Sequence, residues 1–265
     1  MTVGNGVFQL KEGAGWSRGL DNLLGVELGR WFRTKKWWIQ ILIWAAIINA
    51  ILALVVISED GGGAAELAML YNIFVGVFAT FGVCILMQGA IVGEKQSGTA
   101  AWIFSKPVSR PAFLLAKLIA NSVGVALTIV LVQGLIAYLL IYLGSGTILP
   151  PLGFLGGLGA QLVHLFFYVT LTLMLGATFS KRGPVIAIPL LFLFAQELLM
   201  GFFPILVELF PWTLVVPPDG SKYLSVAAAL MTGSQPLSYL PLVTTLGASV
   251  LFVALALWIF ERQEF

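Results

Sequence analysis

Residues 93–117, GEKQSGTAAWIFSKPVSRPAFLLAK, stand between two long apolar runs and hold a short helix-forming piece bracketed by charges and prolines. Ser97 can accept a backbone hydrogen bond as the N-cap of a new helix over 99–105. Pro107 disfavours helical geometry at the residue before it, so this helix should end there. Pro111 suits the first turn of a following helix. The stretch therefore predicts a helix of about two turns, tied between two longer helices.

The composition on either side of this stretch is that of an integral membrane protein. The chain of 265 residues is 59% hydrophobic and only 10% charged, whereas soluble domains carry about 25% charged residues. Runs of about 20 apolar residues can cross the hydrocarbon core as helices. The runs are continuous and do not alternate with a period of two, which favours helices over a barrel. Six spans are predicted, at 37–57, 67–92, 112–143, 152–179, 183–203 and 240–260.

The remaining segments complete one all-helical transmembrane domain over residues 1–265, with the spans inside 37–260. Residues 1–36 form an N-terminal segment, and 20–38 carry apolar residues at helical spacing with basic residues toward the end. This pattern predicts a helix lying in the membrane interface, with a plain juxtamembrane anchor as the alternative. Residues 204–239 contain FPILVELFPW and SKYLSVAAALM, which are too short to span. We expect short interfacial or re-entrant helices there, at the outer face.

The basic residues predict the orientation. With six spans drawn, thirteen of the fourteen Lys and Arg residues fall on one side, and only Lys222 falls on the other. Basic residues accumulate in cytoplasmic loops. Both termini and the loop 94–110 are therefore predicted to be cytoplasmic, in a multi-pass protein of the inner (cytoplasmic) membrane. The first apolar run begins behind a charged segment, which does not resemble a cleavable secretory signal.

The short helix predicted over 99–105 carries large apolar side chains. We expect Trp102, Ile103 and Phe104 to be exposed at the cytoplasmic face, where water would not favour leaving them bare. Membrane lipid or a groove on another protein could cover them. The residues alone leave both coverings open.

The same stretch resembles the first cytoplasmic loop of ABC-2 type (type V fold) transporter permeases. The shared pattern is ExxxGT, a small apolar helix, S-x-P-V-S-R, a hydrophobic pair and Lys. It is carried by Glu94, Gly98, Thr99, Ser105, Pro107, Val108, Ser109, Arg110 and Lys117. In that family the loop is the coupling helix that docks onto the ATP-binding subunit. The resemblance implies that ATPase coupling involves Glu94, Gly98, Thr99, Trp102, Ile103, Phe104, Pro107 and Arg110.

The resemblance also implies what the chain does and with which partners. It looks most like the branch that contains permeases for copper-site maturation, drug or antibiotic export and gliding machinery. The sequence has no G-x-x-x-x-G-K-[ST] phosphate loop, so ATP and Mg²⁺ are expected on a separate ATP-binding subunit. This chain would be a non-catalytic subunit without a cofactor of its own. It would pair with a second permease copy, a homodimer being favoured over a heterodimer, and contact membrane lipid but no nucleic acid. An extracytoplasmic partner is left open.

Two polar residues within the spans are candidate functional sites, because ionisable groups in a membrane often mark a pathway. Glu197 lies in the fifth span, where the outer headgroups or a structural hydrogen bond could also account for it. His164, the only histidine, is expected to be a hydrogen-bonded core residue. Cys84 is the only cysteine, so neither an internal disulfide nor a cysteine metal cluster can form.

Two other functions compete with the ABC permease. An ATP-independent secondary transporter would have broken helices at matching positions of two halves, and these are not evident. An intramembrane enzyme would need a nucleophile and a base in hydrogen-bond reach. The residues available for that are Ser145, in an outer turn, and His164, about halfway along the next span.

Overall fold

The computed structural model describes residues 15–58, 62–218 and 223–263. The structure is 81% helical, and its described residues contain no strand. Six helices are long and apolar enough to cross a membrane, which confirms the predicted number of spans and indicates a multi-pass membrane protein. They are Lys36–Ile57, Ala64–Gln96, Arg110–Ser145, Pro151–Thr178, Arg182–Phe202 and Leu240–Glu261. Lys222 and residues 1–14 of the predicted N-terminal segment lie outside the described residues.

Each of the first three spans is interrupted by a π-helical turn. The first span consists of α2 (Lys36–Trp44), a π turn (Ala45–Asn49) and α3 (Ala50–Ile57). The second consists of α4 (Ala64–Phe74), a π turn (Val75–Ala79), α5 (Thr80–Met87) and, after a turn, α6 (Val92–Gln96). The third consists of α8 (Arg110–Val125), a π turn (Ala126–Leu131) and α9 (Val132–Ser145). Such turns break the regular hydrogen-bond ladder and often mark functional positions.

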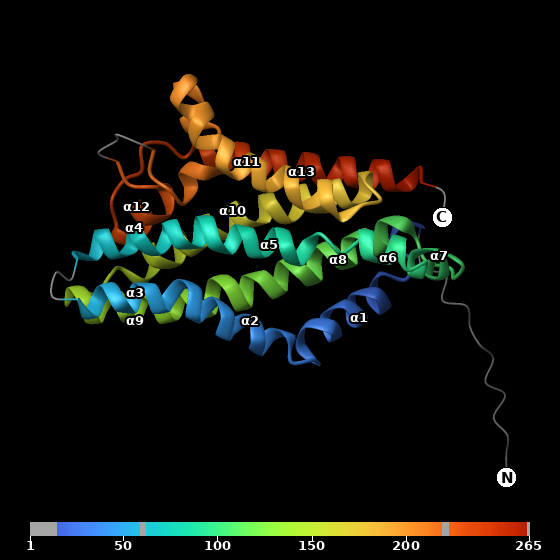
Figure 1. Cartoon of the computed structure of the whole chain (residues 1–265), viewed down its shortest axis with the longest axis horizontal. Helices are drawn as coiled ribbons and strands as arrows, with labels where there is room; N and C mark the ends of the chain where they lie inside the picture. Colours follow the sequence, from blue (N-terminus) through green and yellow to red (C-terminus); the bar gives the residue numbers. More distant parts are fainter. Residues whose placement is uncertain (1–14, 59–61, 219–222, 264–265) are drawn as a thin grey trace, which may run out of the picture.

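The fourth span, α10 (Pro151–Thr178), is the core helix. In the most apolar 18-residue stretch of α10, 72% of the residues are buried. In the corresponding stretch of the last span, α13 (Leu240–Glu261), only 17% are buried. α13 and α11 (Arg182–Phe202) flank α10 on one side, and the α4–α5 span passes in front of it in Figure 1. The core is therefore organised around one central helix.

The two ends of the helix bundle differ (Figure 1). At one end, called here the α7 end, lie α6, the short helix α7 (Thr99–Phe104) and the last residues of α13. At the other, the α12 end, lie α12 (Val226–Thr232) and the 3-10 helices Pro204–Glu208 and Pro211–Leu214. The segment 204–239 therefore contains only short helices in its described part.

Two glycines let the backbone of α12 lie directly on α10. A Cβ at Gly153 would come within 2.5 Å of the Leu230 carbonyl oxygen, and one at Gly157 within 2.6 Å of the Ala227 carbonyl oxygen. Neither backbone atom can move aside as a flexible side chain could. Small residues of this kind allow close helix approach, so α12 packs into the protein as part of its core.

A further helix precedes the first span. α1 (Leu20–Phe32) lies at the α7 end and runs at an angle to α2 (Figure 1). It packs on α8 through Trp31, whose ring occupies the space where Gly124 lacks a side chain: a Cβ there would be 2.4 Å from the indole. Trp31 Nε1 also donates to Asn121 Oδ1 at 3.0 Å. α1 is thus fastened to the third span.

Candidate functional site

The short helix α7 lies between the second and third spans, as predicted, but it begins differently. Its N-cap is Gly98 and not Ser97, because the chain reverses there with φ +73°, a conformation that a residue without Cβ adopts freely. The hydroxyl of Ser97 lies 2.8 Å from that of Thr99, the first residue of α7. The start of α8 is as predicted: Ser109 Oγ accepts from the Ala112 amide at 3.2 Å, with a proline in the first turn.

The prediction that all three large apolar side chains of α7 are exposed is wrong for two of them. Trp102 is 65% exposed, whereas Ile103 and Phe104 are half-buried and pack against the core. The Phe104 ring centroid lies 5.3 Å from that of Phe113 in α8 and 5.8 Å from that of Phe260 in α13. A helix of this length has two faces, so one holds it to the spans and the other presents Trp102.

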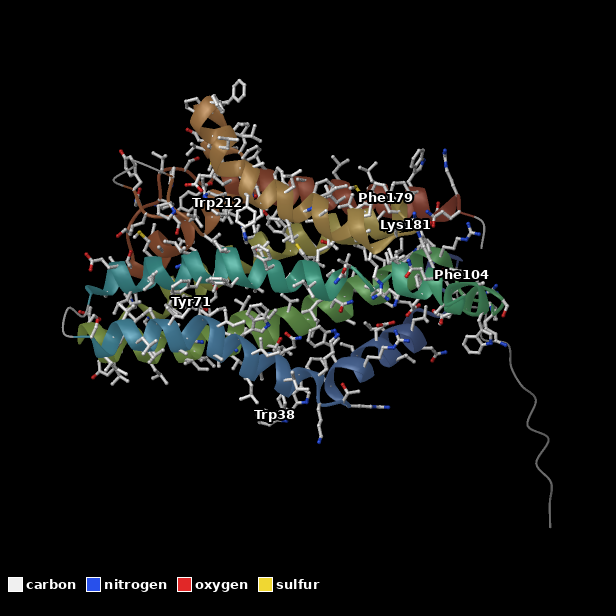
Figure 2. All side chains as sticks on the ribbon, viewed as in Figure 1. Trp38, Tyr71, Phe104, Phe179, Lys181 and Trp212 are labelled. Atoms are coloured by element: carbon white, nitrogen blue, oxygen red, sulfur yellow. The ribbon has the colours of Figure 1, made fainter. Side chains whose placement is uncertain are left out.

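The loop that follows α7 is tied to both ends of the described chain. Arg110 lies over the Phe104 ring and donates a hydrogen bond to the Glu261 carbonyl at the end of α13. The Ser109 amide donates to the Arg18 carbonyl at 3.0 Å, and its hydroxyl donates to the Trp16 carbonyl. Pro107 remains exposed between them. The loop is therefore fastened to the segment before α1 and to the end of α13, at the end of the bundle where Figure 2 labels Phe104.

A cluster of ion pairs lies next to α7 and consists of Glu27, Arg30, Glu94 and Lys117, called here the charge cluster. Lys117 Nζ donates to Glu94 Oε1 at 2.7 Å and to Glu27 Oε1 at 2.9 Å. Arg30 Nη1 reaches the same two oxygens, at 2.8 Å and 2.9 Å. The Lys117 side chain is only 2% exposed. The cluster therefore joins α1, α6 and α8 through two shared carboxylates.

The electrostatics of the cluster favour the charged form of Arg30. The hydrogen bond from Arg30 to Glu94 is the main cause that raises the pKa of Arg30 above its ordinary value, and the charge of Glu27 adds to it. Lys117 is buried, and a buried cation is tolerated when its carboxylate partners are hydrogen-bonded to it. Glu94 was identified above only through the resemblance. In the structure its carboxylate links α6 to Arg30 in α1 and to Lys117 in α8.

The end of α6 is held to the last turn of α10 and to the loop after it. Lys95 Nζ donates to the Ala177 carbonyl at 2.7 Å, and Gln96 Nε2 donates to the Ser180 carbonyl at 2.9 Å. Arg182, at the start of α11, lies over Gly93, where a Cβ would be 3.5 Å from its guanidinium. α6 and α7 are consequently in contact with the third, fourth, fifth and sixth spans. A displacement of α7 would therefore move each of these spans.

His164 is a hydrogen-bonded core residue in α10. Its Nδ1 lies 2.8 Å from the Pro211 carbonyl oxygen. Its Nε2 lies 2.9 Å from the Thr80 hydroxyl oxygen and 3.4 Å from the Gly76 carbonyl oxygen. Both ring nitrogens have partners, which supports the structural role. Ser145 Oγ donates to the Ile141 carbonyl at 2.7 Å, so the structure does not pair it with His164.

The polar residue built into the core of α11 is Gln196, not Glu197. Gln196 is buried, donates to the Tyr168 hydroxyl at 2.7 Å and accepts from the Trp212 amide at 3.2 Å. Glu197, one residue further round the helix, is exposed. The sequence-based prediction selected the charged Glu197 and missed Gln196. Gln196 lies three residues after Leu193 and four before Met200, and this spacing places it on the same helix face as these buried residues.

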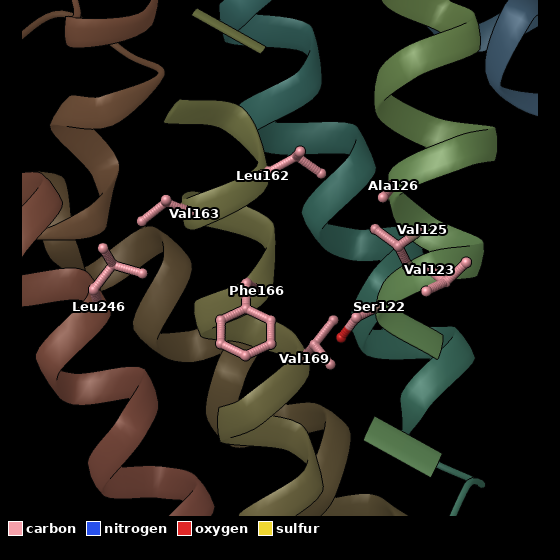
Figure 3. A pocket seen from close by; sticks show the side chains of 9 residues that line it. All are labelled: Ser122, Val123, Val125, Ala126, Leu162, Val163, Phe166, Val169 and Leu246. Carbon is pink, nitrogen blue, oxygen red and sulfur yellow. The ribbon is translucent and has the colours of Figure 1, made fainter. Parts of the chain in front are cut away.

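An apolar hollow of about 360 Å³ lies between α8, α10 and α13 (Figure 3). Its lining includes Phe166 from α10 and Leu246 from α13. Ser122 is the one lining residue with a hydroxyl, and its buried Oγ has no hydrogen-bond partner among the described residues. None of the lining residues is titratable, so this hollow offers room for an apolar group but no acid or base.

Residues 35–265 match the family described as "Protein of unknown function (DUF2705)", and the chain belongs to this family. The matched region covers all six spans and α7. A comparison with curated proteins found no match.

Proposed function

We propose that the chain is the transmembrane permease subunit of an ATP-driven ABC transporter of the ABC-2 type, and that α7 docks onto a separate ATP-binding subunit. The observation that carries this proposal is the two-faced α7. Trp102 is 65% exposed on its outer face, while Phe104 packs against α8 and α13 on its inner face. A docking helix needs an exposed side chain that the partner can bind, and it also needs packed contacts with the rest of its own chain.

The attachment of α7 supports its use as a mechanical link. A partner that moves Trp102 would also move Phe104 and, through the loop, Arg110, which contacts the end of α13. The charge cluster passes the same motion from α6 to α1 and α8. Close-packed contacts of this kind move together and do not deform independently. Displacement of α7 would therefore tilt several spans at once.

The distribution of charge supports a cytoplasmic position for the α7 end, as the proposal requires. Arg30, Lys95, Lys117 and Arg182 lie there, all within contact of α6 or its glycines. The positive-inside rule assigns such an end to the cytoplasm. Both termini and the ATP-binding subunit would then be on the same side of the inner membrane.

The proposed complex contains a second permease copy, favoured as a homodimer, and ATP with Mg²⁺ on the partner ATPase. Alternating access at the permease dimer interface would move an unidentified substrate, in the export direction by analogy with the family. In this arrangement the chain itself is not an enzyme. Its task is to convert motion at α7 into opening at the interface.

Co-expression with a candidate ATP-binding subunit, chosen from among the genes that neighbour the one for this chain, tests the proposal. Affinity purification of the tagged chain is expected to retain the ATP-binding subunit in a stable complex that hydrolyses ATP. The control is the same ATP-binding subunit expressed without the chain. Purification of the chain without any associated ATP-binding subunit would contradict the proposal and favour a secondary transporter.

A further inference from the structure

A polar cavity of about 340 Å³ lies where α1 meets the start of the first span. Three cationic side chains belong to its walls, those of Arg30, Lys36 and Lys117. The two carboxylates of the cavity, Glu27 and Glu94, each accept hydrogen bonds from both Arg30 and Lys117. Lys36 is therefore the cation in excess, and it gives the cavity a net positive charge that attracts anions.

Lys36 is free to bind a ligand. It is partly exposed and lines the cavity, so a ligand can reach it there. Its ammonium lies 4.2 Å from the centroid of the Trp31 ring and makes no hydrogen bond within the described part of the chain. The face of an aromatic ring holds a cation in place, but it leaves the N–H donors of an ammonium available to oxygen atoms. A phosphate group beside Lys36 would accept charge-assisted hydrogen bonds from these donors.

The chain around the cavity carries charge of the same sign. Residues 30–36, called here the elbow, join the end of α1 to the start of α2. Arg33 and Lys35 are exposed within the elbow, and residues 28–58 include no Asp or Glu. Basic clusters next to a membrane span attract lipids with anionic headgroups. The elbow therefore raises the local concentration of anionic lipid around the cavity.

The side of α2 that carries Lys36 continues as apolar surface. Ile39 and Ile43 follow Lys36 by three and seven positions, which places them on the same side of the helix. Both are exposed, Ile39 to 52% and Ile43 to 42%. Trp38, which Figure 2 labels near the bend between α1 and α2, is 55% exposed, and tryptophans gather at the headgroup level of membranes. An anion at Lys36 thus lies at headgroup depth, with space for acyl chains along α2.

We propose that this cavity binds the headgroup of a phospholipid with a net negative charge, such as phosphatidylglycerol. The headgroup phosphate lies beside the Lys36 ammonium, and the acyl chains lie on the exposed side of α2 at Ile39 and Ile43. A headgroup that also carries an ammonium brings another positive charge to a cavity that already has one in excess, so it binds less tightly. The site requires only that the chain lies in a membrane, and it does not depend on an ATP-binding subunit.

Native mass spectrometry of the purified full chain, alone in detergent, tests the assignment with phosphatidylglycerol, phosphatidylethanolamine and phosphatidylcholine of identical acyl chains. Phosphatidylglycerol is expected to bind about fivefold more tightly than either of the other two, the effect of about one charge near a basic cluster. Soluble glycerophosphoglycerol has the same headgroup without acyl chains. It is expected not to displace the lipid at equal concentration.

Substitutions at two neighbouring lysines separate the cavity from the general charge of the elbow. Lys36→Gln is expected to weaken phosphatidylglycerol binding about tenfold, since it removes the charge that pairs with the phosphate. Lys36→Arg keeps that charge and is expected to stay within about twofold of the unaltered chain. Lys35→Gln is the matched control, because Lys35 is exposed and is not on the cavity walls. Exposed charges are screened at an ionic strength of about 0.15 M, so Lys35→Gln is expected to change the affinity less than about twofold.

Equal affinity of the unaltered chain for phosphatidylglycerol and phosphatidylcholine would overturn the proposal. Equal losses from Lys36→Gln and Lys35→Gln would also overturn it, because they would assign the preference to the general charge of the elbow and not to the cavity. Displacement of the lipid by an equal concentration of glycerophosphoglycerol would contradict a lipid occupant. Because the chain is tested alone, none of these results bears on the proposed docking role of α7.

Discussion

Replacement of Lys117 by methionine is expected to lower the free energy of unfolding by about 3–5 kcal/mol. The Lys117 side chain is 2% exposed, and its ammonium is shared by Glu27 and Glu94. Methionine has similar length but no charge, so two nearly buried carboxylates would lose their buried partner and face each other. The change is measured as a loss of monodisperse, folded protein on heating in detergent, monitored by size-exclusion chromatography.

Arg30→Met is the matched control, because Arg30 binds the same two carboxylate oxygens from the exposed side. Its side chain is 51% exposed, so its removal is expected to cost no more than about 1 kcal/mol. Equal effects of the two substitutions, or no effect of Lys117→Met, would show that burial of the ammonium does not stabilise the junction of α1, α6 and α8.

Trp102→Asp is expected to abolish copurification of the ATP-binding subunit. Aromatic anchors that fill a pocket at the centre of an interface contribute about 2–4 kcal/mol, which corresponds to roughly 30- to 700-fold in Kd. Aspartate would in addition bring a charge into an apolar groove. Affinity purification of the co-expressed complex, with the retained ATP-binding subunit quantified, gives the result.

Trp102→Phe is the matched variant, since it keeps an apolar ring and is expected to retain most of the complex. Both variants should have the melting temperature of the unaltered chain, because Trp102 is 65% exposed and the folded chain does not depend on it. Unchanged copurification of Trp102→Asp would remove α7 from the interface. A lowered melting temperature would instead assign Trp102 to the fold.

The spans and the ends of the helices around α7 could be predicted from the sequence because their causes are local. Continuous apolar runs fix the spans, and Pro107 and Pro111 fix where one helix ends and another begins. The N-cap at Gly98 was missed because it depends on the direction in which the chain must turn. Serine is among the residues favoured at an ordinary N-cap, but it does not readily adopt a positive φ.

Features that depend on contacts between distant segments could not be predicted from the sequence. Glu27 and Lys117 are separated by 90 positions, and only the docking of α1 on α8 brings them together. The inward direction of Phe104 depends on the rings of Phe113 and Phe260. A signal was nevertheless present, since Lys117 stands within an otherwise apolar segment and a buried cation requires a partner.

A cross-link from position 102 is the most direct measurement of the proposed docking role of α7. Cys84 is the only cysteine and is buried, so Trp102→Cys introduces an accessible thiol for a cross-linker with a maleimide at one end and a photoactivated diazirine at the other, which needs no cysteine on the partner. We predict a covalent adduct between this chain and the ATP-binding subunit in membranes, and none from Gln235→Cys, an exposed position between α12 and α13. Absence of the adduct from position 102, or an adduct from position 235 alone, would contradict docking through α7.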